Sequence, residues 1–283
     1  TPNWLVQIAS STAPQLALTD PNGGTNAKHG IIRFANGNFY IGTSSDALSA
    51  TSTFFTIDGN NGKINIGVGN NTGAFAVPNI VVGYNNVATG QGGSTSVVFG
   101  DNNNVQWSGV GIGKSNSTGL ASFASAVGVQ NTATIDNANA FGELNSALAT
   151  FSSAFGYKNL TTATLSSAFG ASTTASGIQS SVFGASSTAT QLFASAFGYN
   201  NTASAQGALA IGFGITNSTA SSTMLGPSNV SKLTILNSGA AGLGTTTPNW
   251  LLQLASSTAP QLALTDSSAG ANLKRWIMRS AGG

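Results

Sequence analysis

Residues able to perform acid–base, metal or nucleophilic chemistry are few and scattered along this chain of 283 residues. It has one histidine, His29, and no cysteine. General acid–base catalysis needs titratable groups within hydrogen-bond reach of one substrate. The chain's seven carboxylates are far apart in the sequence, so only distant parts of the fold could bring two of them together. His29 becomes Arg275 in a second copy of the surrounding sequence, which argues against a Ser-His-Asp triad and a histidine-based metal site. We therefore predict no enzyme, no cofactor and no metal site. The seven carboxylates are Asp20, Asp46, Asp58, Asp101, Asp136, Glu143 and Asp266.

Other motifs of ligand binding are incomplete. The string from Gly109 to Gly113 alternates glycine with apolar residues, but it lacks the strand, helix and lysine of a nucleotide-binding loop. Calcium-binding β-rolls repeat Gly-Gly-x-Gly-x-Asp, whereas aspartate follows glycine here only at Asp101. Glycosylation sequons are expected by chance in a chain so rich in Asn, Ser and Thr. They begin at Asn70, Asn116, Asn159, Asn200, Asn217 and Asn229.

Charge and hydropathy exclude further classes of protein. The formal net charge is +2, from nine basic and seven acidic residues, and only Lys274-Arg275-Trp276 comes close to a cluster of basic and aromatic side chains. A nucleic-acid-binding surface would cluster them, so we predict no nucleic-acid partner. No apolar run approaches the roughly 20 residues that cross a bilayer, and we predict no membrane span in this segment. The chain starts at Thr1 without a signal-peptide pattern, which indicates a processed product or a window from a longer protein.

The elements that must position any functional side chain are set by a 14-residue repeat. Seven equal intervals need a structure in which every repeat has the same surroundings, as in a stacked solenoid. Only 6% of the residues are charged, Glu occurs once, and small polar and β-branched residues dominate, so strands and turns are favoured over helices. We predict an all-β chain with a parallel β-roll of 14-residue coils and β-hairpin connectors. The repeating glycines are Gly128, Gly142, Gly156, Gly170, Gly184, Gly198, Gly212 and Gly226.

Two apolar ladders precede these glycines. The residue directly before glycine is always large, and the one before that is nearly always small. Because neighbouring strand residues point to opposite faces, both faces should be buried, one inside a narrow roll and the other between chains. An uncovered aromatic stripe would be unusual for a soluble monomer, so we predict a homo-oligomer. The ladder of large residues is Val127, Phe141, Phe155, Phe169, Phe183, Phe197, Ile211 and Leu225.

The third residue after glycine is often Asn, as at Asn131, Asn145, Asn159 and Asn201. Asn tolerates left-handed turns and can form stacked amide ladders. We interpret these Asn side chains as ordinary turn residues.

A second, longer repeat relates the two ends of the chain. Residues 247–283 match residues 1–37 at a constant offset of 246, with 25 identities among the 37 aligned positions. We therefore expect a window from a tandem array of modules of about 246 residues. The Asn36-Gly37 pair predicts a hairpin turn. We predict four regions: 1–78, a β-rich connector with hairpins; 79–226, the β-roll; 227–246, a β connector; and 247–283, the truncated start of a second copy of the first region.

The Ser-Ala-Phe-Gly-x-x-x-Ser/Thr-Ala repeat of residues 79–226 resembles the head repeats of trimeric autotransporter adhesins. This resemblance implies three chains in a left-handed parallel β-roll, an extracellular cell-surface location, and binding to host-cell or matrix proteins or glycans. The chain differs from that family in using Phe where Ile or Val is usual. The flanks, at 55–67 and 242–248, are similar to strings in bacteriophage tail-fibre shafts and in giant surface proteins of uncultured bacteria.

These observations favour a non-catalytic extracellular fibre or adhesin module that associates with itself as a homotrimer and in tandem. A bacteriophage tail-fibre shaft, on a virion tail, is the main alternative. A monomeric solenoid enzyme and an ice-binding solenoid are further alternatives. The ice-binding alternative requires a flat outward Thr-x-Thr array, which we expect the repeat to lack.

Overall fold

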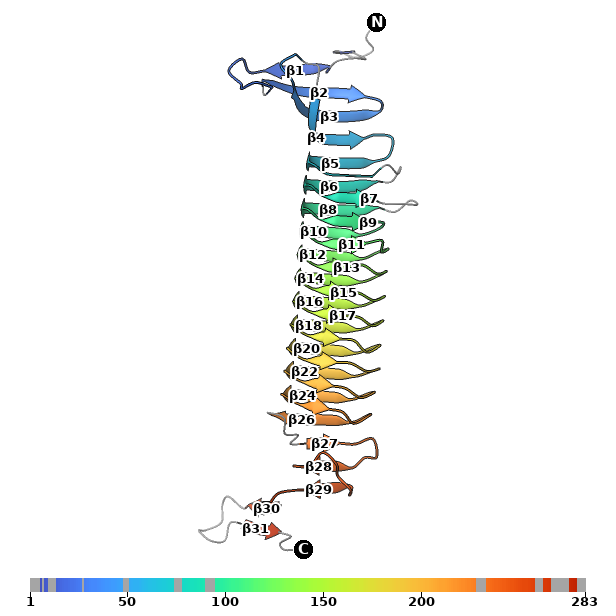
Figure 1. Cartoon of the computed structure of the whole chain (residues 1–283), viewed down its shortest axis with the longest axis vertical. Coiled ribbons are helices and arrows are strands. Elements are labelled where there is room, and N and C mark those ends of the chain that lie inside the picture. Colours follow the sequence, from blue (N-terminus) through green and yellow to red (C-terminus); the bar gives the residue numbers. More distant parts are fainter. Residues whose placement is uncertain are drawn as a thin grey trace. The chain divides into compact units, whose positions relative to one another are not determined.

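The computed structural model describes residues 6, 8, 9, 14–26, 28–47, 51–73, 78–89, 95–227 and 233–257, together with the strands Leu262–Thr265 and Arg275–Met278. These residues form β-strands and turns without a helix, which confirms the predicted all-β class. The chain comprises two compact units, residues 1–151 and 152–283. In each unit, parallel coils of about 14 residues stack on one another and form a β-solenoid, also as predicted (Figure 1).

Antiparallel hairpins open the first unit. The turn at Asn36 and Gly37 has two positive φ angles, 52° and 82°, as the sequence predicts for a tight hairpin. Each strand pairs antiparallel with the next. The strands are β1 (Leu16–Thr19), β2 (His29–Ala35), β3 (Asn38–Ser44), β4 (Thr51–Asp58) and β5 (Lys63–Val68).

Pairing then becomes parallel, because β5 and the next long strand run in the same direction. Each coil contributes one strand to a first sheet and one short strand to a second sheet, and equivalent strands of successive coils pair in register. The first sheet of this unit continues through β6 (Asn79–Tyr84), β8 (Ser96–Asp101), β10 (Val110–Lys114), β12 (Ser125–Val129) and β14 (Asn139–Glu143). The second sheet holds β7 (Val87–Thr89), β9 (Asn104–Gln106), β11 (Ser117–Gly119), β13 (Thr132–Ala133) and β15 (Ser146–Ala147).

The second unit repeats this arrangement with a uniform 14-residue register. Its first sheet holds β16 (Ser153–Tyr157), β18 (Ser167–Ala171), β20 (Ser181–Ala185), β22 (Ser195–Tyr199), β24 (Leu209–Phe213) and β26 (Thr223–Pro227). Its second sheet holds β17 (Leu160–Thr161), β19 (Thr174–Ala175), β21 (Thr188–Ala189), β23 (Thr202–Ala203) and β25 (Thr216–Asn217).

Short strands follow the coils of the second unit. β27 (Leu233–Ile235) runs antiparallel to β26, β28 (Ala241–Leu243) is antiparallel to β27, and β29 (Leu252–Leu254) pairs parallel with β28. β30 (Leu262–Thr265) and β31 (Arg275–Met278) form a separate antiparallel hairpin.

Small side chains fill the inside of the coils. In the second unit, Ala168 and Ala196 of the first sheet and Ala175 and Ala189 of the second sheet are fully buried in one apolar cluster. The two sheets are thus the two walls of a flattened coil, and their other faces point away from each other. The ladder of small residues therefore lies inside, and the ladder of large residues lies outside.

The Asn residues after glycine are buried and form a stacked amide ladder of the kind that the sequence allows, instead of acting as ordinary turn residues. Asn131 is fully buried. Its Nδ2 donates to the carbonyl oxygens of Val127 at 2.9 Å and Gly142 at 2.7 Å, and its backbone N–H donates to Asn116 Oδ1 at 3.0 Å. A buried amide must satisfy its polar groups, and here it does so by joining three coils. The side chain therefore stabilises the corner from inside, which turn propensity alone does not reveal.

The two copies of the long repeat pair their strands alike. β1 and β2 align Leu16 with Ile32 and Thr19 with His29. β30 and β31 align Leu262 with Met278 and Thr265 with Arg275, which is the same register shifted by 246 residues.

Candidate functional site

The outer face of the first sheet carries the aromatic ladder. In the second unit, Phe155, Phe169, Phe183 and Phe197 stack with ring centroids 4.9, 4.9 and 5.2 Å apart and nearly parallel planes. Phe183 is 40% exposed and Phe197 is 37% exposed, although each has a ring on at least one side. The ladder continues in register through Ile211 and Leu225. In the first unit, Val127 pairs with Phe141 in the same way.

A second outward row lies beside the aromatic ladder, one residue beyond the glycine. Tyr199 and Phe213 stack there at 5.4 Å between centroids, and the Lys158 Nζ lies 5.0 Å from the Tyr157 ring centroid. Tyr157, Tyr199 and Phe213 are all exposed. The two rows together form a broad apolar face, which is the kind of surface that marks an interaction site.

The glycines between these two rows allow the coils to approach closely. At Gly184 the φ angle is +130°, and an added Cβ would overlap the carbonyl oxygen of Gly198 in the next coil. The same overlap recurs between successive repeat glycines within each unit. The structure aligns Gly128 with Gly142 in the first unit, and Gly156, Gly170, Gly184, Gly198, Gly212 and Gly226 in the second. The ladder begins earlier than the strict repeat, at Gly67 in β5, which pairs with Gly83.

The outer face of the second sheet carries hydroxyl groups, in the second unit as a Thr-x-Thr pair in one coil and as Thr-x-Ser pairs in the coils beside it, so the expected absence of a repeating Thr-x-Thr array holds for the sequence while hydroxyl groups still recur. Ala189 is buried between Thr188, which is half-buried, and Thr190, which is exposed. Alternation along the strand therefore points both threonines outward. Thr174, Thr188, Thr202 and Thr216 pair in register. Thr188 and Thr202 share a hydrogen bond of 3.3 Å between their hydroxyl oxygens.

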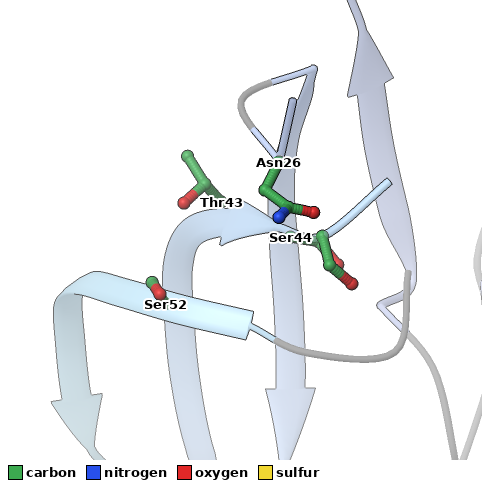
Figure 2. A pocket seen from close by; sticks show the side chains of 5 residues that line it. Asn26, Thr43, Ser44 and Ser52 are labelled. Carbon is green, nitrogen blue, oxygen red and sulfur yellow. The ribbon is translucent and has the colours of Figure 1, made fainter. Parts of the chain in front are cut away.

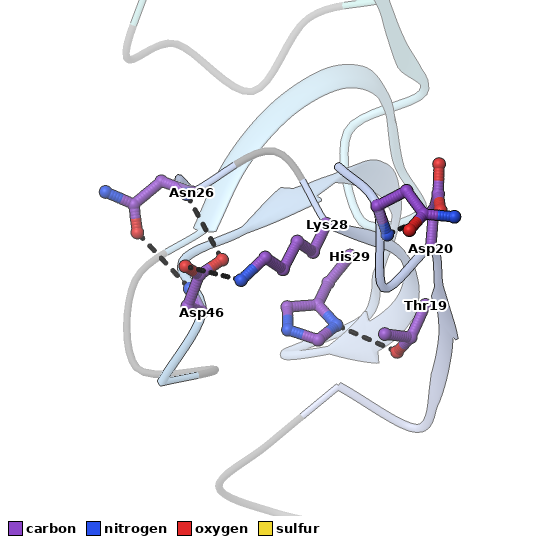
Figure 3. Close-up of polar contacts among 7 residues, drawn as sticks. Thr19, Asp20, Asn26, Lys28, His29 and Asp46 are labelled. Atoms are coloured by element: carbon purple, nitrogen blue, oxygen red, sulfur yellow. Dashed lines mark hydrogen bonds and ion pairs between the residues drawn. The ribbon is translucent and has the colours of Figure 1, made fainter. Parts of the chain in front are cut away.

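Polar side chains gather on the hairpins of the first unit (Figure 3). Asp46 accepts a hydrogen bond from the Asn26 backbone N–H at 3.1 Å and lies 3.5 Å from Lys28 Nζ. His29 Nδ1 and Thr19 Oγ1 are hydrogen-bonded at 2.8 Å. These contacts join the loops around β1, β2 and β3, and they stabilise the hairpins.

A small pocket lies close to this group (Figure 2). Its volume is about 220 Å³, and hydroxyl and amide side chains line it: Asn26, Thr43, Ser44, Ser45 and Ser52. A serine nucleophile needs a base within hydrogen-bond reach, but the His29 ring bonds Thr19, which is not part of the pocket. We therefore assign the pocket no chemistry.

The predicted scatter of the carboxylates persists in the fold. Asp58 ends β4 and accepts a hydrogen bond from Asn61 Nδ2 at 2.7 Å, which lowers the pKa of its carboxyl group. The backbone N–H groups of Asn60 and Asn61 and the charge of Lys63 also lower this pKa, whereas burial raises it. Asp136 accepts the Ser122 N–H at 2.7 Å. Asp101 and Glu143 lie on strands, and Asp266 lies outside the described residues. Among the described residues, no three His, Asp or Glu side chains gather as metal ligands would.

The remaining motifs are structural where they are described. Gly111 and Gly113 lie on β10. The sequon residues Asn116, Asn159 and Asn217 are buried, so the folded chain cannot present them for glycosylation, whereas Asn200 is exposed. Within the described part of the chain, no helix is long and apolar enough to span a membrane.

Comparisons of the chain with protein-family models, curated proteins and solved structures find no match.

Proposed function

We propose that this chain is a module of an extracellular bacterial surface fibre or adhesin, which associates with itself side by side as a homotrimer. The half-exposed aromatic ladder carries the proposal. Its rings repeat at the spacing of the coils, so a surface that covers them along their whole length must repeat at the same interval. A second copy of this chain has that repeat. The stoichiometry of three and the host-cell or matrix ligand rest on the resemblance to adhesin heads.

The same geometry suits mechanical extension better than catalysis. Each coil contacts its neighbours through main-chain pairing and buried alanines, so the solenoid lengthens by adding equal units. A tail-fibre shaft would use this architecture in the same way. The position of the gene, beside baseplate genes or behind a secretion signal, separates the two proposals.

Phe183→Asp tests the side-by-side contact. We expect loss of the oligomer and a drop in stability of about 2–5 kcal/mol per chain, because a charge would be buried without a partner. Light scattering gives the mass, thermal melting gives the stability, and electron microscopy of the unsubstituted protein shows whether the fibre has threefold symmetry.

The matched control is Thr190→Asp, which adds the same charge in the same coil on the opposite outer face. It should leave the mass unchanged. Equal masses for Phe183→Asp and the unsubstituted protein would contradict the proposed contact. Binding of the purified protein to cells and matrix proteins, measured beside a hydrolase panel, tests the adhesin function. Turnover abolished by replacing one carboxylate, without surface binding, would refute it.

Binding to ice is a second candidate function, and the hydroxyl face of the second sheet favours it. Coils about 4.8 Å apart and outward residues about 6.7 Å apart along each strand would repeat these hydroxyl groups in two directions, and a regular hydroxyl array is what the ice-binding alternative requires. Residues 152–227 contain one charged side chain, Lys158. Lys158 lies beside Tyr157 of the first sheet. The hydroxyl array on the second sheet therefore contains no charged side chain that would hold water molecules around it.

A pair of double substitutions tests the ice-binding candidate. Thr188→Lys with Thr202→Lys places two charges in the array. Ser186→Lys with Asn200→Lys places them at corners equivalent to Lys158, whose φ of 53° matches those of Ser186 and Asn200. If the array binds ice, thermal hysteresis should fall more than tenfold in the first variant and persist in the second. No hysteresis in the unsubstituted protein, or equal loss in both variants, would exclude ice binding.

A further inference from the structure

The end of the second unit contains a strand that is added to a sheet edge from outside the coils. β28 pairs antiparallel with β27 on one side and parallel with β29 on the other. The Ala241 N–H donates to the Leu251 carbonyl, and the Ala255 N–H donates to the Leu243 carbonyl, both at 2.9 Å. The edge of β28 is thus an acceptor site for a short extended segment.

The segment that occupies this edge is the start of the second copy of the long repeat. Residues 247–255 differ from residues 1–9 at two positions only: Leu252 corresponds to Val6, and Leu254 corresponds to Ile8. Both replacements are apolar, and Val and Ile favour strands more strongly than Leu. Parallel pairing uses main-chain groups, so residues 1–9 can make the same ladder.

The hairpin after this segment also folds alike in both copies, because β1–β2 and β30–β31 have the same register. Val6 and Ile8 are 77% and 55% exposed. In the second copy, Leu252 remains 63% exposed although its strand is paired, so the pairing rests on main-chain groups, which the first copy shares.

We propose that residues 1–9 are a joint segment that adds in parallel to the β28 edge of another copy of this module, so that modules couple end to end by strand addition. In this chain β29 occupies that edge. The joint would explain how modules of the proposed fibre connect. It depends on the proposed function in one respect, that the chain is a module of a fibre. Its occupant is a second copy of the same sequence, and its specificity comes from the near identity of the two segments.

Competition between the two segments determines how the joint behaves. β29 is tethered to β28 by a short linker, which gives it an effective concentration in the millimolar range. A segment from another chain is present at micromolar concentration and should lose. We therefore expect the unsubstituted chain to keep its own edge closed, and weakening β29 should open it to residues 1–9 of another chain.

Gln253→Pro opens the edge. Gln253 lies midway between Leu251 and Ala255, whose main chains bond β28, so in a parallel ladder its N–H also faces β28. Proline removes that donor and is poorly tolerated in a paired strand. In sedimentation at 10–200 µM, the Gln253→Pro chain should form species that are multiples of the unsubstituted particle and grow with concentration. Gln253→Pro combined with Gln7→Pro should not, because Gln7 is the sequence equivalent of Gln253.

Two outcomes would overturn the joint: a Gln253→Pro chain of unchanged mass, or equal association with and without Gln7→Pro. If the Gln253→Pro chain does not fold, as judged by circular dichroism, a labelled peptide of residues 1–13 is added to the unsubstituted protein at about 10 mM, above the effective concentration of β29. Retention of this peptide, but not of its Gln7→Pro version, supports the joint, and equal or absent retention contradicts it. The aromatic ladder is unchanged throughout, so failure of the joint is distinguishable from failure of the side-by-side contact.

Discussion

Gly184→Ala should destabilise the second unit by about 4 kcal/mol, the sum of backbone strain and overpacking. The φ angle of +130° is one that residues with a Cβ rarely adopt, and the added methyl group would overlap the Gly198 carbonyl oxygen. Moving either coil away would weaken the main-chain pairing of β20 and β22 on both sides of the glycine. The measurement is urea unfolding followed by circular dichroism.

Gly239→Ala is the matched control for this substitution. Gly239 lies in the same unit with a φ of +86°, but nothing lies within 4 Å of its added Cβ. It should therefore show the strain alone, about 1–2 kcal/mol. Equal losses for the two variants would mean that the contact between coils does not select glycine.

Periodicity made the coils predictable from the sequence. An exact 14-residue spacing requires equivalent surroundings, so it predicts register as well as fold class. Pairing of Phe169 with Phe183, and of Gly170 with Gly184, is a direct consequence of that spacing. The hairpin at Asn36 and Gly37 was predictable for a different reason, because few residue pairs adopt two positive φ angles at low cost.

Side-chain direction was harder to predict where one residue type suits two environments. Asn131 fits an exposed left-handed turn and a buried hydrogen-bonded corner equally well, and only the number of buried carbonyl groups near it decides between them. The large and small ladders could each have filled the roll. The narrow coil accepts Ala196 rather than Phe197, which is a matter of volume between two walls.

The corners of the coils were not predictable from residue preference. Each coil turns through residues with positive φ, and Leu165 at 60° and Phe193 at 60° occupy such positions. Large side chains avoid this region, so local propensity opposes the observed turn. Stacking on neighbouring coils imposes it: the Phe193 N–H, for example, donates to the Ile178 carbonyl at 3.0 Å.

Deleting one whole coil should be tolerated, whereas deleting half a coil should unfold the second unit. Removal of residues 170–183 joins Phe169 to Gly184, and every remaining residue keeps its position relative to glycine. The loss should be the contribution of one coil, with the fold retained. Circular dichroism and thermal melting measure both properties.

Removal of residues 177–183 is the half-coil comparison. Positive-φ corners fall at Ser172 and Gln179, seven residues apart, so seven residues separate one wall of the coil from the other. The residues after the deletion would enter the second sheet with the pattern of the first, which sends Phe197 and its equivalents to the wrong wall. Inward alanines would stay inward, but the repeat glycines and buried Asn residues would no longer stack on their equivalents, because Gly198 would take the place of Gln191 and Asn201 that of Ala194. We therefore expect loss of cooperative unfolding. Equal melting temperatures for the two deletion variants would show that the 14-residue period does not determine this fold.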